Sequence, residues 1–132
     1  MSTTKKSAEV PPILLIEDES SVSAFVRAAL ERRGYKVELA SSGADGVAKL
    51  ASGMYAGVIS DIRMPGTING VGVQHWIQAH RPELCERIIL ISGDTANSET
   101  QSLLTASNTP CLAKPFRVQQ LISTVETTFG KP

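Results

Sequence analysis

The sequence predicts an α/β domain built on a parallel sheet, with helices covering both faces. Short apolar segments alternate along the chain with segments whose apolar residues recur at helical spacing. The apolar runs at 13–16, 56–60 and 88–91 do not alternate with polar residues, which is typical of strands buried on both faces. We therefore expect five parallel strands and five helices, joined by right-handed crossovers.

Five segments have the length and composition of strands. They are 13–16, 35–39, 56–60, 88–91 and 111–113. The segment at 35–39 differs from the others because its apolar and polar residues alternate, which indicates a strand at an edge of the sheet.

The segments between and after these strands have helical spacing. The first helix contains Val22–Leu30, and Gly34 is placed to end it. Ser42 is a candidate N-cap of a second helix that Gly53 ends, and a third helix spans about 70–80. The segment 95–108 is rich in Ser, Thr and Asn, so we expect a weak and mobile helix there. The fifth helix runs over 118–129, with Pro115 suited to its start.

Size and composition indicate one domain. The 132 residues include 13 Lys and Arg and 13 Asp and Glu, so the formal net charge is zero, which argues against direct nucleic-acid binding. The longest aliphatic runs, such as 13–16, are too short for membrane insertion or a signal peptide. The cysteines Cys85 and Cys111 form no C-x-x-C pair, so we expect reduced thiols and a cytoplasmic location. Residues 1–11 are expected to be a flexible leader and 12–130 the folded domain.

Polar and charged side chains follow four of the predicted strands, at the edge where parallel sheets bind ligands. These are Glu17, Asp18 and Glu19 after the first strand, Asp61 after the third, Ser92 after the fourth and Lys114 after the fifth. Close carboxylates repel one another and need a cation to stay ionised together, and oxygen ligands favour Mg²⁺. A carboxylate can also attack phosphorus, and phosphoryl transfer then needs mainly positioning and charge neutralisation. We therefore expect a phosphoryl-transfer site at this edge.

Four motifs follow in order along the chain: LLIEDE at 14–19, SDIRMPG at 60–66, ISG at 91–93 and AKPF at 113–116. With them, about residues 12–129 resemble the response-regulator receiver domains of two-component signalling, the family of the bacterial chemotaxis regulator. The resemblance implies a flavodoxin-like doubly wound sheet with strand order 2-1-3-4-5. Asp94-Thr95 after Ser92-Gly93 is similar to receivers attached to hybrid sensor kinases.

The resemblance also implies a role for each matching residue. Asp61 would be the phosphoacceptor, and Mg²⁺ would be held by Glu17, Asp18, Asp61 and the backbone carbonyl of Arg63. Ser92 and Lys114 would bind the phosphoryl group, and the Lys114–Pro115 peptide is often cis in this family. Cys111 stands where the family usually has an aromatic switch residue. We therefore expect the switch region, Ser92 with Cys111, to work without an aromatic rotamer change and through the segment 92–108.

The implied function is phosphorylation of Asp61 by a phosphohistidine of a sensor histidine kinase or phosphotransfer protein, which switches contacts with an unknown downstream protein. The domain would catalyse only its own phosphorylation and dephosphorylation. Because the chain ends soon after the last predicted helix, we expect a stand-alone receiver or one excised from a longer protein.

Three other functions compete with this interpretation. An Asp-nucleophile phosphohydrolase would carry a second acid two residues after Asp61, where this chain has Arg63. A flavin module would need a first loop that cradles phosphate, which the acidic residues at 17–19 would repel. A receiver-like interaction module that is never phosphorylated stays open as the alternative.

Overall fold

The computed structural model describes residues 10–63, 68–93 and 109–132. Within them, five strands form one parallel sheet in the order β2-β1-β3-β4-β5, which confirms the predicted class and strand order. The strands are β1 (Ile13–Ile16), β2 (Val37–Ala40), β3 (Gly57–Asp61), β4 (Ile88–Ser92) and β5 (Cys111–Ala113). The helices are α2 (Ser20–Arg32), α3 (Gly43–Ser52), α4 (Gly70–His80) and α6 (Val118–Phe129), with a 3₁₀ turn η1 (Pro82–Leu84). The helix predicted at 95–108 and most of the leader lie outside the described residues.

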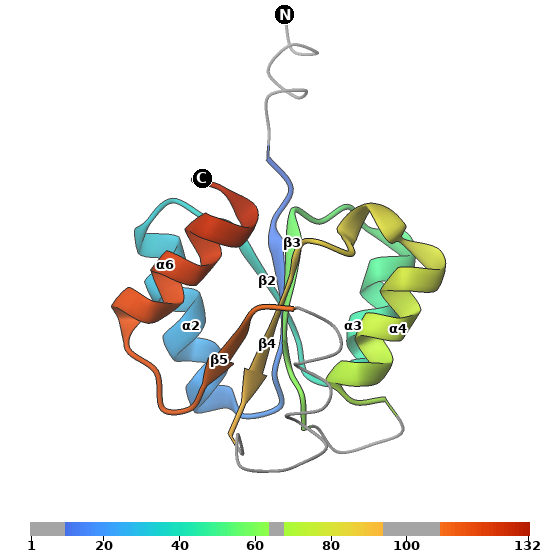
Figure 1. The fold of residues 1–132 in the computed structure, drawn as a ribbon, viewed down its shortest axis with the longest axis horizontal. Helices are drawn as coiled ribbons and strands as arrows, with labels where there is room; N and C mark the ends of the chain where they lie inside the picture. The colour runs from blue at the N-terminus through green and yellow to red at the C-terminus, as the bar shows by residue number, and fades with distance from the viewer. Residues whose placement is uncertain (1–9, 64–67, 94–108) are drawn as a thin grey trace, which may run out of the picture.

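The helices form one layer on each face of the sheet. Figure 1 shows α2 and α6 on one side of the strands and α3 and α4 on the other. Side chains along β1 alternate between these layers: Ile13 and Leu15 pack in the core with α2 and α6, and Leu14 and Ile16 in the core with α3 and α4. Burial on both faces explains why β1 is apolar throughout.

Several helices begin and end at residues that the sequence identifies as capping residues. The Ser42 hydroxyl accepts a hydrogen bond from the Asp45 backbone N–H at 3.1 Å, so it caps α3 as predicted. Gly34 follows α2 with φ of 98°, a conformation that favours glycine, and this confirms its predicted place. The helix predicted over 70–80 has the bounds of α4.

Three boundaries differ from the prediction. β2 starts at Val37 because Tyr35 belongs to the turn after α2, where its N–H donates to the Leu30 carbonyl and its hydroxyl to the Gly130 carbonyl. β3 includes Asp61, which pairs with Ile91, and β4 extends by one residue.

The fifth predicted helix has the expected bounds, Val118–Phe129. Pro115, which the sequence suggested for the helix start, lies before the N-cap Arg117, whose N–H donates a hydrogen bond to the Gln120 side chain in the first turn. The Lys114–Pro115 peptide before it is cis.

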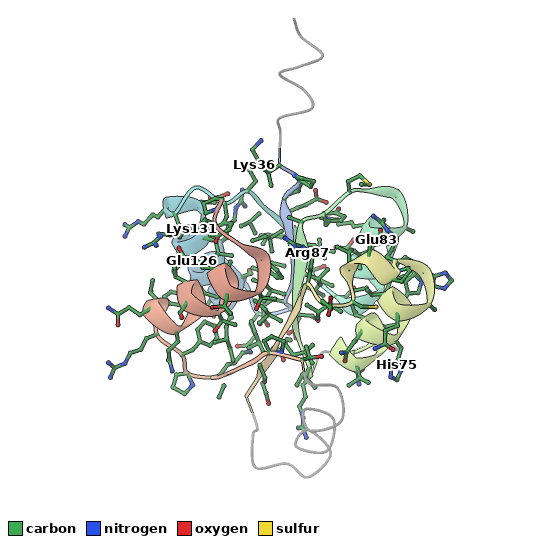
Figure 2. All side chains as sticks on the ribbon, turned by 45° about the horizontal axis from the view of Figure 1, so that its top comes forward. Lys36, His75, Glu83, Arg87, Glu126 and Lys131 are labelled. Atoms are coloured by element: carbon green, nitrogen blue, oxygen red, sulfur yellow. The ribbon has the colours of Figure 1, made fainter. Side chains whose placement is uncertain are left out.

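At the end of the sheet where the strands begin, hydrogen bonds from Arg87 connect neighbouring elements. Figure 2 places Arg87, which precedes β4, over the middle of the sheet between the two helix layers. Its guanidinium donates to the Ala56 carbonyl beside β3 and to the Phe129 carbonyl at the end of α6. The predicted site lies at the opposite end, at the bottom of Figure 1, toward which the β4 arrow points. Of the helices in the described part of the chain, none has the length and apolar character needed to cross a membrane.

Candidate phosphoryl-transfer site

The pairing of the strands brings the predicted site residues together at one end of the sheet. Ile16 at the end of β1 lies beside Ser60 of β3, so Glu17 follows in the same row as Asp61. On the other side, Ser92 of β4 pairs with Ala113 of β5, and the Lys114 N–H donates to the Ser92 carbonyl at 2.8 Å. The site therefore depends on the order of the strands, which places β3 between β1 and β4.

The Lys114 ammonium is the centre of the site. Its Nζ lies 2.7 Å from Asp61 Oδ2, 3.3 Å from Glu19 Oε1 and 3.5 Å from Glu17 Oε1. Burial alone would lower the pKa of Lys114, but the hydrogen bond to Asp61 and the neighbouring carboxylates outweigh it and raise the pKa above its usual value. Lys114 is therefore a fixed positive charge facing Asp61.

Glu17 is the most enclosed carboxylate of the group. Its side chain has no exposed surface, and Oε2 accepts a hydrogen bond from the Glu19 backbone N–H at 3.1 Å. Among the described residues, Oε1 has no hydrogen-bond donor. Burial, together with the charge of Asp61, raises the pKa of Glu17 from 4.5 to about 7. A buried oxygen without a donor, beside other carboxylates, marks a place that a cation would satisfy.

Asp61 is held in a defined orientation. Its side chain is 5% exposed, and Oδ1 accepts a hydrogen bond from the Arg63 backbone N–H at 3.0 Å while Oδ2 faces Lys114. Gly70 at the start of α4 lies against it, so close that a Cβ there would be 2.5 Å from the Asp61 carbonyl oxygen. Only glycine allows α4 to begin at this distance from the site.

The other predicted residues lie around this centre in different ways. Ser92 is buried at the end of β4, and Arg63 supplies the N–H described above. Asp18 is exposed and close enough to Glu17 to contribute to its raised pKa. Cys111 is half-buried, and burial raises the pKa of its thiol.

The sequence placed Glu19 at this edge of the sheet without assigning it a specific role, and the structure places its carboxylate beside Lys114. Oxygen atoms of Glu17, Glu19 and Asp61 lie within 4.8 Å of one another, and among the described residues this is a group of carboxylates that could hold a metal ion. The sequence signal for Glu19 is its spacing of two residues from Glu17, which predicts this placement only where the backbone is extended. Glu19 has extended backbone angles, and residues two apart in extended chain point to the same side, so Glu19 follows Glu17 into the site.

An apolar pocket of about 540 Å³ adjoins the site. Its lining comes from α2 and from the chain after β4 and β5: Ser21, Val22, Phe25, Gly93, Lys114, Pro115 and Phe116. Lys114 belongs to both the pocket and the carboxylate group, so the site has an open side.

A buried aspartate at the end of a central parallel strand, flanked by carboxylates and faced by a lysine, is an arrangement suited to phosphoryl transfer in a domain of the doubly wound class. The model of the response regulator receiver domain family matches residues 13–126. The chain belongs to this family, whose members are signalling phosphoacceptors and not enzymes that turn over a substrate.

Individual relatives are similar over the same region. The transcriptional regulatory protein GltR of Pseudomonas aeruginosa is 26% identical over 91% of this chain, which covers 49% of GltR. The sensor kinase CckA of Brucella abortus is 30% identical over 90% of this chain, which covers 12% of CckA. The chain thus spans about half the length, or less, of these curated relatives.

Solved structures agree with the fold. Chemotaxis protein CheY4 of Vibrio cholerae superposes with a TM-score of 0.78 at 24% identity, covering 91% of this chain and 99% of CheY4. The response regulator TrrA of Thermotoga maritima, determined in complex with Mg²⁺-BeF, has a TM-score of 0.77 at 29% identity and covers 90% of this chain and 99% of TrrA. The acidic pocket of this chain fits aspartate phosphorylation with a divalent metal, as in such phosphorylatable receivers.

Proposed function

We propose that Asp61 accepts the phosphoryl group, and that Lys114 and Ser92 bind it. The observation that carries this proposal is the 2.7 Å contact between Lys114 Nζ and Asp61 Oδ2, in a site that also contains Glu17 Oε1, an oxygen with no hydrogen-bond donor in the described part of the chain. The ammonium lies where charge on the phosphoryl oxygens would develop, and this is the stabilisation that phosphoryl transfer needs most.

The proposed step is a displacement at phosphorus. An oxygen of Asp61 forms a bond to phosphorus while the bond from phosphorus to the donor's histidine nitrogen breaks, and that nitrogen keeps the electron pair. Lys114 then moves from the Asp61 oxygen to a phosphoryl oxygen, and the Ser92 hydroxyl donates to another. Attack of water on phosphorus would later return Asp61 and inorganic phosphate.

Mg²⁺ is the proposed metal. The oxygen-only donor set of buried Glu17 and Asp61 suits a hard divalent cation that keeps several waters. Asp18 and the backbone carbonyl of Arg63 would complete the site. When bound, the metal would neutralise negative charge on the carboxylates and the phosphoryl group. The Mg²⁺-BeF complex of TrrA supports this assignment.

The proposed partners follow from the chemistry of the acceptor. A sensor histidine kinase or a phosphotransfer protein would donate the phosphoryl group in the cytoplasm, and the phosphorylated domain would change its contacts with a downstream protein. The relatives include both transcriptional regulators and a sensor kinase. They support a receiver domain in either kind of protein.

The test is phosphotransfer from a panel of autophosphorylated histidine kinases and phosphotransfer proteins, followed on gels with and without Mg²⁺. The wild type should gain label from at least one donor only with Mg²⁺, and Asp61→Asn should gain none. Transfer that is equally efficient in excess chelator, or to Asp61→Asn, would contradict the proposal.

A further inference from the structure

Glu19 occupies the N-cap position of α2 without capping the helix. Ser, Thr, Asp and Asn are preferred at this position because their short side chains bond the first turn. The Glu19 side chain makes no such bond. Its Oε1 lies instead 3.3 Å from Lys114 Nζ, across 95 residues of sequence.

We propose that Glu19 is a positioning residue that restrains phosphorylation of Asp61 by competing with the phosphoryl group for Lys114. This inference rests on the proposed function of Asp61 and Lys114. It concerns how readily the acceptor is loaded.

The competition follows from the number of partners around Lys114. The Lys114 ammonium donates hydrogen bonds to Asp61 Oδ2 and Glu19 Oε1, and Glu17 Oε1 lies 3.5 Å away. When the phosphoryl group forms, Lys114 leaves the Asp61 oxygen for a phosphoryl oxygen, whereas the hydrogen bond to Glu19 still holds the ammonium toward the mouth of the site. Glu17 and Asp61 are enclosed, whereas the Glu19 side chain is 59% exposed, so Glu19 is the partner at the mouth of the site.

The negative charge of Glu19 also opposes phosphorylation of Asp61. Phosphorylation replaces the single charge of the Asp61 carboxylate with up to about two charges on the phosphoryl group, a net gain of about one negative charge near Glu19. Removing the charge of Glu19 therefore frees Lys114 and lowers repulsion at the mouth. Because the pair is partly exposed, the effect should be about two- to fivefold, the range of exposed ion pairs.

The rate of phosphorylation by acetyl phosphate at saturating Mg²⁺, followed by intact mass, tests the inference. We expect Glu19→Gln to be faster than wild type by about two- to fivefold at low salt, and the gain to shrink at high salt because screening weakens exposed charge pairs. Glu19→Asp keeps the charge and should stay closer to wild type. Glu86→Gln removes an exposed carboxylate beside the start of β4, at the far end of the sheet, and should leave the rate unchanged.

A double-mutant comparison shows whether Glu19 acts through Lys114. In a Lys114→Gln background, the gain from Glu19→Gln should shrink, since the shared ammonium is gone. An equal gain in both backgrounds would contradict the competition. Slower phosphorylation with weaker Mg²⁺ affinity would make Glu19 a metal ligand and overturn the proposal, as would a rate equal to wild type. A wild type that gains no phosphoryl group would instead reject the proposed function itself.

Discussion

Replacing Glu17 by glutamine should stabilise the metal-free protein at alkaline pH and leave it nearly unchanged in acid. Glu17 is fully enclosed, and burial raises its pKa to about 7 in the folded protein, compared with an ordinary 4.5 in the unfolded chain. Unfolding therefore releases a proton between these pH values. The stability that this group contributes is complete below pH 4.5 and is lost as the pH rises through 7.

The size of the effect follows from these two values. Each unit between the folded and unfolded pKa corresponds to about 1.4 kcal/mol. The interval from 4.5 to about 7 gives up to about 3 kcal/mol at pH 8. A glutamine side chain cannot ionise, so the Glu17→Gln variant should keep at pH 8 the stability that the wild type has only in acid.

Urea denaturation in excess chelator, followed by far-UV circular dichroism from pH 5 to pH 8, measures this. The difference in unfolding free energy between Glu17→Gln and wild type should grow as the pH rises, and Mg²⁺ should reduce it by stabilising the wild type at pH 8. Glu86→Gln, at an exposed site, is the control and should show no such trend. A difference that is constant across this pH range would refute the assignment of Glu17 as a buried carboxylate with a raised pKa.

Three further substitutions test other parts of the structure. Gly70→Ala should cost about 1–3 kcal/mol and slow phosphorylation, because the new Cβ would press on the backbone of Asp61, as denaturation and intact mass can measure. Tyr55→Phe should cost about 1 kcal/mol below pH 10 by removing the hydroxyl bond to Glu38. Burial, with this bond, raises the pKa of Tyr55 to about 12, so phenolate absorbance should appear near pH 12. Cys111→Ala should keep the hydrogen-exchange response to beryllofluoride across 92–108.

Each of these predictions has an opposing result. A Gly70→Ala protein with wild-type stability would show that α4 can shift freely at its start. A Tyr55 titration midpoint near pH 10 would contradict the buried Tyr55 hydrogen bond. Loss of the exchange response in Cys111→Ala, while beryllofluoride still binds, would make Cys111 the coupling residue.

The sequence predicts the fold well where the signal is local. The unbroken apolar runs of β1, β3 and β4 reflect burial on both faces, and Ser42 caps α3 through its own side chain. The start of β2 depends on distant partners instead. Tyr35 continues the alternation of the strand in sequence, but its hydroxyl bonds Gly130, 95 residues away, and it stays in the turn.

The site shows the same division between local and distant information. The strand ends identify Asp61 and Lys114, since each stands directly at or after an apolar strand. Within Glu17-Asp18-Glu19, composition alone does not say which carboxylates face inward. That depends on the extended backbone at Glu19 and on Lys114, which approaches from the other end of the chain.

The most direct test of the central claim is the intact mass of the protein after treatment with acetyl phosphate and Mg²⁺. The wild type should gain the mass of one phosphoryl group, which is lost in hydroxylamine because an acyl phosphate is labile, and Asp61→Asn should gain nothing under the same conditions. An equal gain by Asp61→Asn would contradict the assignment of Asp61 as the phosphoacceptor.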